Sequence, residues 1–598
     1  MAMDAVGFGR RIALSKSTKF KPSDVARALL AQGVKPHLLT EAFDAPGAEA
    51  LVAAAETGKL RWAKHAELDQ RASLYAQALS NKPYVEWLDL ADRAEQLDQD
   101  KLYVPIWSTV NAHLGTEARS IPDLVGQLGV ARFARRPIVG DSFCGGGSIP
   151  FEAARLGCDV VASDLNPIAC MLTWGALKVV GSVPDTRARL EATQKEVAAA
   201  VDAEITALSI EHNSRGDRAK AYLYCLETRC PQTGYLVPLL PSRIISRARK
   251  TIAVLEPDHA AKRFAIRVCA ECTDADLADA ETGTVKGGDL VVTLDGETHR
   301  TPIKTIRGDR KDASGGAINS LRFWEQQDFI PAPNDIFQER LYAIQWITRE
   351  TVGASRQDTY FASVTADDLA REERVVEIVR KNLAVWQEQG LVPDMRIEPG
   401  QNTRQPVWER GWTHWHHLFG ARQLHLLAIY GRLARERPDE IEAGLQAILL
   451  ARALNNNARL CRWLAAQLDA KGKPLHGDQI KEVFYNQALN TMLNWGQRSS
   501  VYQNTEDPAF SALPGHGIVV PSNAGQLPSD ASIWITDPPY ADAVRYEEIT
   551  EFFIAWLRKN PPAPFKDWVW DSRRALAIKG TGESFKSEMI TAYKNLAV

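Results

Sequence analysis

The sequence Asp537-Pro538-Pro539-Tyr540 places an acid, two rigid residues and an aromatic ring in four consecutive positions. Proline fixes the backbone φ angle, so the Asp537 carboxylate and the Pro538 carbonyl are held as hydrogen-bond acceptors. Two fixed acceptors suit a planar exocyclic amine, and Tyr540 offers a face on which a planar base can stack. As the amine becomes tetrahedral, its lone pair can attack a methyl sulfonium. The motif therefore predicts chemistry at the amine of a base.

A glycine-rich turn earlier in the chain predicts a second part of the same site. Gly145, Gly146 and Gly147 follow an expected strand at 137–143 and precede an expected helix, where glycine permits a ligand to approach the backbone closely. Asp164 ends the next expected strand, about 20 residues on, where a carboxylate can accept both hydroxyls of a ribose. The spacing differs from GxGxxG and the chain contains no GxxxxGK[ST], which favours a nucleoside cofactor other than a dinucleotide or a P-loop triphosphate.

The elements that must position these residues are those of an open α/β sheet. The segment 135–177 alternates strand, turn, helix and strand as one βαβ unit, and 533–536 is expected to be an inner strand that ends at Asp537. Ligands of open α/β sheets bind at the carboxyl ends of the strands. The two motifs are therefore predicted to face one cleft.

Changes in local amino-acid composition along the chain predict five regions. Alanine, leucine and charged residues indicate a helical N-terminal region, and β-branched residues with an Asp295-Gly296 hairpin signal indicate a β-rich insertion. The predicted regions are a helical region 1–128, a cofactor-binding half 129–204, a β-rich insertion 205–314, a mixed insertion 315–411 with possible target recognition, and a helical and catalytic half 412–598.

Composition limits the class of protein and its partners. The 598 residues carry a net charge of −3 and eight scattered cysteines, which excludes a disulfide scaffold and a globally basic nucleic-acid binder. No apolar run reaches the roughly 18 residues of a membrane span, so a cytoplasmic protein is predicted. Nucleic-acid binding must then rest on local basic clusters. The residues expected to contact a duplex are Arg243, Arg247, Arg249, Lys304, Arg307 and Arg310.

Both motifs together resemble S-adenosylmethionine-dependent amino-methyltransferases, and DPPY resembles the adenine-N6 DNA methyltransferases. The stretches DSFCGGGSIPFEAARLG, SDLNPIA, YLYCLETRCPQTGYLVPL, GWTHWHHLFGARQL and DPPYADAVRYEEITEFFIAWL resemble the large bacterial adenine-specific DNA methylases with a zinc-ribbon insertion. This resemblance covers about two thirds of the chain and implies a Rossmann-like methyltransferase sheet, interrupted by a ribbon-like β insertion and helical regions, with double-stranded DNA as substrate. It also implies a restriction or phage-defence setting with partner subunits.

Carried onto this sequence, the resemblance assigns roles residue by residue. Asp537, Pro538, Pro539 and Tyr540 would hold the target amine. The residues that would hold S-adenosylmethionine are Asp141, Phe143, Gly145, Gly147, Asp164 and Asn166.

The zinc ribbon of that family is eroded in this chain. Thr233 stands where the first knuckle needs its second thiolate, and the hairpin expected to hold the other pair contains no cysteine. A metal-free β insertion is favoured, and the alternative zinc site would use Cys225, Cys230, Cys269 and Cys272. The run HWHH, with His414, His416 and His417, is interpreted as a packed corner rather than a metal site.

Alternatives from other classes stay open. The same amine chemistry serves RNA guanine-N2 and cytosine-N4 methyltransferases, and a non-catalytic DNA-binding scaffold of a defence complex is a further alternative. A C5-cytosine mechanism needs a Pro-Cys nucleophile, which the sequence lacks.

The C-terminal segment is short for the sheet that the resemblance implies. Only about 58 residues follow Tyr540, holding an expected helix 544–559, an expected strand 575–580 and a helix begun at 584, whereas a seven-strand sheet would need three more strands. The apolar positions of the last helix, among them Ile590 and Tyr593, need a surface to bury against. We therefore expect a longer protein or a second polypeptide that completes the sheet.

Overall fold

The computed structural model describes residues 5–16, 18–484, 489, 491, 494–499, 512–524, 526, 531–539, 545–578 and 582–596. These fall into two compact units. The first comprises Met1–Ile138 with Ala153–Asp159, and the second Val139–Glu152 with Val160–Val598.

The first unit is helical, in agreement with the composition of the N-terminal region. Its core gathers apolar side chains such as Phe8, Leu29 and Phe43, and the Phe43 ring stacks on Trp62 with centroids 4.5 Å apart. The helices are α1 (Ala5–Leu14), α2 (Pro22–Ala31), α3 (Ala48–Glu56), α4 (Leu68–Leu79), α5 (Tyr84–Trp87), α6 (Gln99–Tyr103), α7 (Trp107–Leu114) and α8 (Ile121–Phe133).

A four-stranded sheet in the second unit holds both predicted motifs. Its strands are β1 (Ile138–Asp141), β2 (Asp159–Asp164), β18 (Gly517–Pro521) and β19 (Ile533–Trp534), in the spatial order β18-β2-β1-β19. β18 runs parallel to β2, and β19 runs parallel to β1. Helix α9 (Ser148–Arg155) connects β1 to β2, and α10 (Pro167–Gly175) follows β2. The local sequence therefore forms the predicted βαβ unit.

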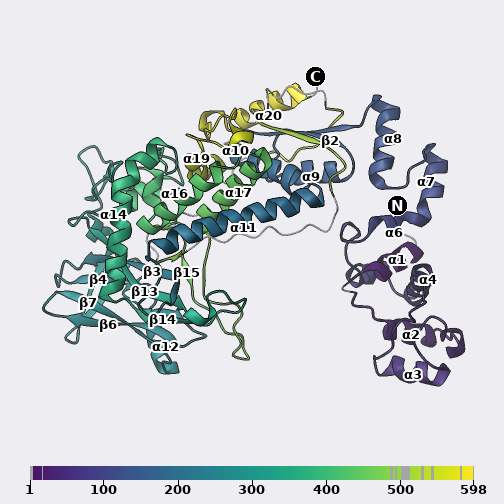
Figure 1. Cartoon of the computed structure of the whole chain (residues 1–598), viewed down its shortest axis with the longest axis horizontal. Helices are drawn as coiled ribbons and strands as arrows, with labels where there is room; N and C mark the ends of the chain where they lie inside the picture. The colour runs from purple at the N-terminus through teal and green to yellow at the C-terminus, as the bar shows by residue number, and fades with distance from the viewer. Residues whose placement is uncertain are drawn as a thin grey trace. The chain divides into compact units, whose positions relative to one another are not determined.

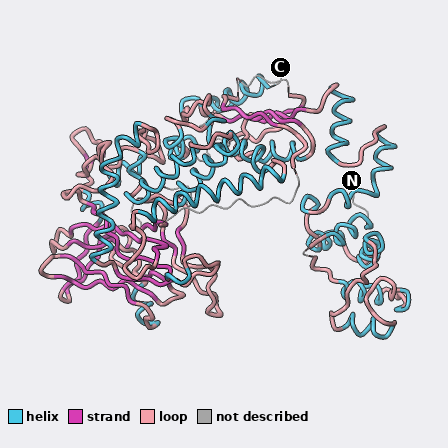
Figure 2. Tube along the Cα trace, in the orientation of Figure 1, coloured by secondary structure: helices cyan, strands magenta, loops and turns pink. Residues whose placement is uncertain are grey.

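A layer of helices occupies the middle of the second unit. Figures 1 and 2 show α11, α16 and α17 side by side between the four-stranded sheet and a larger group of strands. Their core includes Trp412, Trp415 and Tyr430, each fully buried. The helices are α11 (Pro184–Ala207), α14 (Ala366–Glu388), α15 (Arg404–Arg410), α16 (Ala421–Arg435), α17 (Glu440–Asn456), α18 (Tyr546–Ile549) and α19 (Glu551–Leu557).

An eight-stranded sheet forms the β-rich part of the chain. Its path is β14-β13-β3-β4-β7-β6-β5, with β17 also paired to β3. The strands are β3 (Arg218–Arg229), β4 (Leu236–Leu239), β5 (Ile244–Ser246), β6 (Thr251–Asp258), β7 (Arg263–Cys269), β13 (Phe337–Ile347), β14 (Thr359–Ser363) and β17 (Trp495–Arg498). The sheet therefore continues past residue 314, into segments that the sequence assigned to a mixed insertion and to the catalytic half.

The Asp-Gly signal forms the expected hairpin between β9 (Asp289–Leu294) and β10 (Glu297–Pro302). Asp295 and Gly296 both have positive φ angles, 50° and 82°, which a two-residue turn of this kind requires. The smaller elements nearby are α12 (Asp274–Ala280), β8 (Val285–Lys286), α13 (Ile303–Arg307), β11 (Arg310–Lys311) and β12 (Ala317–Ile318), and β15 (Trp463–Leu464) pairs with β16 (Gln479–Ile480).

Three expectations for the C-terminal segment have different outcomes. The strand before Asp537 is short and stands at an edge of the described sheet, because among the described strands it pairs only with β1. The expected strand at 575–580 is wrong for its described residues, because 575–576 belong to a 3-10 turn and 577–578 are not strand; residues 579–580 lie outside the described part. The last helix is present as α20 (Glu583–Leu596).

Within the described residues, no single helix has the length and apolar content needed to cross a membrane. The segments Pro167–Val180 and Pro184–Ala207 meet that test only jointly, and they are bent by 116°.

Candidate active site at the edge of the parallel sheet

The glycine-rich turn between β1 and α9 lies tightly against α10 and leaves its outer backbone open. Gly147 has a φ angle of +87°, and a β carbon there would come within 2.9 Å of the Cα atom of Thr173. Gly145 also has a positive φ angle, +48°, and a β carbon on Gly146 would meet nothing within 4 Å. Glycine is therefore required by packing at 147, while open space beside 146 leaves room for a ligand at the backbone.

Asp164, at the end of β2, holds this turn in place through hydrogen bonds. One carboxylate oxygen accepts a hydrogen bond from Gly145 N at 3.1 Å, and the other accepts from Asn166 N at 2.9 Å. Asn166 in turn caps α10, because its side-chain oxygen accepts from Ile168 N at 3.0 Å. Burial, and less strongly the charge of Asp141, raises the pKa of Asp164, while the two backbone donors act in the opposite direction.

Asp141, at the end of β1, joins the two sequence motifs. Its carboxylate is buried, and one oxygen accepts hydrogen bonds from Phe143 N at 3.1 Å and from Thr536 Oγ1 at 2.8 Å. Burial raises the pKa of Asp141, and the charge of Asp537 raises it further. The residue next to the DPPY motif is thus bonded to an acid of the glycine-rich turn.

Asp537 itself is exposed and follows β19, so it lies at the carboxyl end of its strand, as Asp141 and Asp164 do. With Pro538 and Pro539 it lines an open groove of about 520 Å³, whose opposite wall is helix α20. Tyr540, the predicted stacking residue, lies outside the described residues. The described residues that α20 contributes to the groove are Phe585, Lys586, Met589, Ile590 and Tyr593.

Asp141, Asp164 and Asp537 form one chain of neighbouring carboxylates. Each adjacent pair is close enough for the charge of one acid to raise the pKa of the other. In the described part of the chain, no lysine or arginine forms an ion pair with any of them. The buried hydroxyls of Ser142 and Ser163, beside two of these acids, have no hydrogen-bond partner among the described atoms. The edge can therefore accept hydrogen bonds from an amine or from sugar hydroxyls.

Thr536 and Ser142 are site residues that the sequence interpretation did not name. Each is a hydroxyl residue next to a predicted acid at the end of a strand, Thr536 before Asp537 and Ser142 after Asp141. That position is a signal that could have identified both, although the bond from Thr536 to Asp141 spans 395 residues.

The six residues predicted to contact DNA are mostly partnered within the chain. Arg243 contacts the Asp279 carboxylate at 2.5 Å, and Arg247 forms a two-pronged pair with Glu281. The other three arginines bond to neighbouring groups: Arg249 to Thr359, Arg307 to Asp309, and Arg310 to Ser320. Lys304 is exposed on α13. Their contact with DNA stays a prediction.

The four cysteines of the alternative zinc site lie in three separate hydrophobic clusters. Cys225 and Cys230 are buried in different clusters, and Cys272 lies in a third with Cys269 at its margin. Among the described residues, no group of three or more histidine, cysteine or acidic side chains could hold a metal ion. The four thiols are therefore not arranged as one ligand set.

The three histidines of HWHH form a packed corner. His417 Nδ1 accepts hydrogen bonds from the backbone N–H groups of Thr413 and His414, at 3.1 and 3.2 Å, so its proton is on Nε2 and is donated to the Glu325 carbonyl. Burial lowers the pKa of His416 to about 3 and also lowers that of His417. Both rings are neutral packing groups at ordinary pH.

Searches against protein-family models, curated proteins and solved structures give no match to this chain. The functional inference therefore rests on the motifs and on the geometry of this sheet edge.

Proposed function

We propose that the protein is a DNA methyltransferase that transfers a methyl group from S-adenosylmethionine to adenine N6. The observation that supports this most is the meeting of Asp141, Asp164 and Asp537 at one sheet edge, with Thr536 bonded to Asp141. Numbered along the chain, the four strands have the spatial order 3-2-1-4. Nucleotide-binding doubly wound sheets begin with the same order, and their ligands lie at the carboxyl ends of the strands.

The residues of the turn fit an adenosyl cofactor. The open backbone at Gly145 and Gly146 allows close approach, and the lone pairs of Asp164 not used by backbone donors can accept the ribose hydroxyls. Phe143 adds an aromatic side chain beside the turn. When bound, the cofactor supplies an electrophilic methyl group.

The target amine would be held by Asp537 and Pro538. Its two hydrogens are donated to the Asp537 carboxylate and the Pro538 carbonyl, which directs the nitrogen lone pair toward the cofactor and stabilises the positive charge that develops. Thr536 positions this loop through Asp141. A base must leave the duplex to reach the groove, and Tyr540 is proposed to stack on it.

The test compares two variants with distinct expected losses. Asp537→Asn should lower methyl transfer to DNA by about 10²–10³-fold with cofactor affinity unchanged, because it removes one charged acceptor from the developing cation. Asp164→Ala should weaken S-adenosylmethionine binding by about tenfold or more, measured by calorimetry. The control is Asp567→Asn, an exposed acid outside the groove, which should change neither quantity.

Mass spectrometry of digested nucleic acid identifies the methylated base. Label on N6-methyladenine supports the proposal. Label only on cytosine N4 or on RNA guanine contradicts it and favours the corresponding alternative enzyme, and cofactor-free DNA binding without any transfer favours a scaffold.

A further inference from the structure

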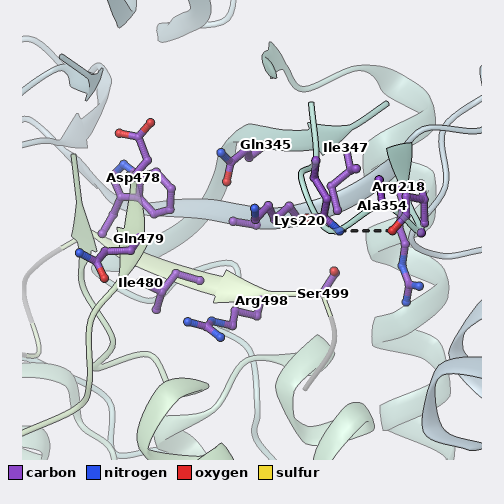
Figure 3. Close-up of a pocket in the computed structure, with 15 residues that line it drawn as sticks. Arg218, Lys220, Gln345, Ile347, Ala354, Asp478, Gln479, Ile480, Arg498 and Ser499 are labelled. Carbon is purple, nitrogen blue, oxygen red and sulfur yellow. Dashed lines mark hydrogen bonds between the residues drawn. The ribbon is translucent and has the colours of Figure 1, made fainter. Parts of the chain in front are cut away.

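A cavity of about 510 Å³ with both apolar and cationic side chains in its lining lies in the β-rich part of the second unit, among residues that no sequence motif identified (Figure 3). Its walls come from β3, β13, β16 and β17 and from the loop that follows β13. A volume of this size is typical of small-molecule and cofactor sites.

Two cationic side chains in this cavity have no acidic partner among the described residues. Lys220 is an exposed position between buried neighbours near the start of β3, and Arg498 lies on the neighbouring strand β17, after which Ser499 N approaches the Lys220 carbonyl at 3.5 Å. Among the described residues, no carboxylate lies within ion-pair distance of either cation. Desolvation, followed by the charges of Arg249 and Arg498, lowers the pKa of Lys220. The surroundings of Lys220 are therefore electropositive.

The acidic residue in the lining of this cavity, Asp478, already has hydrogen-bond partners. Asp478 accepts hydrogen bonds from Ser246 Oγ at 2.7 Å and from Ala466 N at 2.8 Å. Arg218, at the other end of the cavity, is paired with Glu211 at 3.0 Å. Neither residue neutralises the charge of Lys220 and Arg498, so within the described part of the chain this charge is available to an external anion.

The donors in the cavity suit a phosphate group. An ammonium carries three donors and a guanidinium five, and the side-chain amides of Gln345 and Gln479 lie on the same walls. A guanidinium binds two phosphate oxygens with its planar fork, and a lysine binds phosphate as a point charge. Trp463 adds an aromatic ring to the lining, which a base attached to the phosphate could contact.

We propose that this cavity is a nucleotide phosphate site, in which Lys220 and Arg498 bind the phosphate. The phosphate is either part of a nucleic-acid backbone or carried by a free nucleotide. The proposal does not depend on methyl transfer.

The test measures binding by the full chain without S-adenosylmethionine. Anisotropy with a short labelled DNA duplex, over a series of salt concentrations, reports a backbone phosphate, and calorimetry with adenosine monophosphate reports a free nucleotide. The test variant is Lys220→Gln/Arg498→Gln. The control Lys262→Gln/Lys286→Gln removes the same charge from exposed positions outside the cavity. A second variant, Lys220→Arg/Arg498→Lys, keeps the charge, and the midpoint of thermal unfolding checks that each variant is folded.

For a backbone phosphate, the test variant should bind the duplex about tenfold more weakly, and the slope of log affinity against log salt should fall by about 1 in magnitude. For a free nucleotide, the same variant should lose the heat of adenosine monophosphate binding while duplex affinity stays unchanged. In both cases the control and the charge-keeping variant should bind like the wild type. Unchanged affinity for both probes in the test variant, or no binding of either probe by the wild type, overturns the proposal. A failure of methyl transfer alone would contradict the proposed function and leave this result intact.

Discussion

The carboxylates of the parallel sheet edge and those of the eight-stranded sheet have opposite surroundings. Glu227, fully buried on β3, contacts Arg263 at 2.6 Å and Arg340 at 2.7 Å. Asp141, equally buried at the end of β1, is bonded only to a backbone N–H and a threonine hydroxyl among its described partners. One sheet neutralises its acids with arginine, and the other leaves them with neutral donors.

This difference distinguishes acids that stabilise the fold from acids that are available to bind a substrate. A carboxylate fixed between two guanidinium groups has its charge and lone pairs occupied, as Glu339 does between Arg410 and Arg459. A carboxylate such as Asp537, which has no cationic partner among the described residues, can still accept hydrogen bonds from a substrate amine. The Lys220 cavity is the opposite case, because Lys220 and Arg498 have no carboxylate partner among the described residues.

The largest expected effect comes from breaking a structural pair. Glu227→Ala should lower the free energy of unfolding by about 3–5 kcal/mol, because it leaves the two arginines without their buried partner. Asp537→Asn, an exposed change at the other sheet, should alter it by only about 0.5 kcal/mol or less. Urea unfolding of the two variants checks the comparison, and equal losses would show that the acids do not differ in structural role.

A second prediction concerns acidic pH, which should have opposite effects on stability through the buried His416 corner and through Asp141 of the parallel sheet edge. The pKa of His416 in the folded chain is about 3, against about 6.5 when unfolded, so between these values the unfolded chain binds the extra proton. The contribution of neutral His416 to the free energy of unfolding is therefore fully present above pH 6.5. As the pH falls from 6.5 toward 3, this contribution decreases by up to about 1.4 kcal/mol per pH unit. Asp141, whose pKa is raised, favours the folded state on protonation.

Unfolding in urea at a series of pH values between 7 and 5 measures this effect. The variant His416→Gln keeps an N–H donor for the Asp328 carbonyl but cannot titrate. Its stability should depend less steeply on pH than that of the wild type. Identical slopes in the two proteins would mean that His416 does not carry the acid sensitivity.

The parts of the fold that the sequence predicted are those specified by neighbouring residues. The βαβ unit, the tip position of Asp164 and the hairpin at Asp295-Gly296 each depend on a turn and the strands beside it. Local patterns also identified both acidic motifs, whose meeting follows from a general rule about strand ends.

Contacts between distant segments could not be predicted in this way. The basic runs gave no indication that Arg247 would pair with Glu281, or that Arg340 would reach Glu227 across 113 residues. The sequence likewise contains no local sign of the cavity, because Lys220 and Arg498 are brought together only by the pairing of β17 with β3. A sequence shows how many lysine and arginine residues a segment contains, but it does not show which of them lack a carboxylate partner in the fold.

The smallest expected effect separates the two regions most sharply. Thr536 Oγ1 donates to the buried Asp141 carboxylate at 2.8 Å, and Thr228 Oγ1 donates to the Ile336 carbonyl at 2.9 Å in the eight-stranded sheet. Replacing either with valine removes one hydrogen bond and preserves the shape of the side chain, so each variant should lose about 1 kcal/mol of stability. Thr536→Val alone should also slow methyl transfer, because the loop that carries Asp537 loses its link to β1, while cofactor affinity stays near that of the wild type. Urea unfolding and single-turnover transfer rates measure the two quantities. If both variants slow transfer in proportion to their lost stability, the bond from Thr536 is structural and has no positioning role.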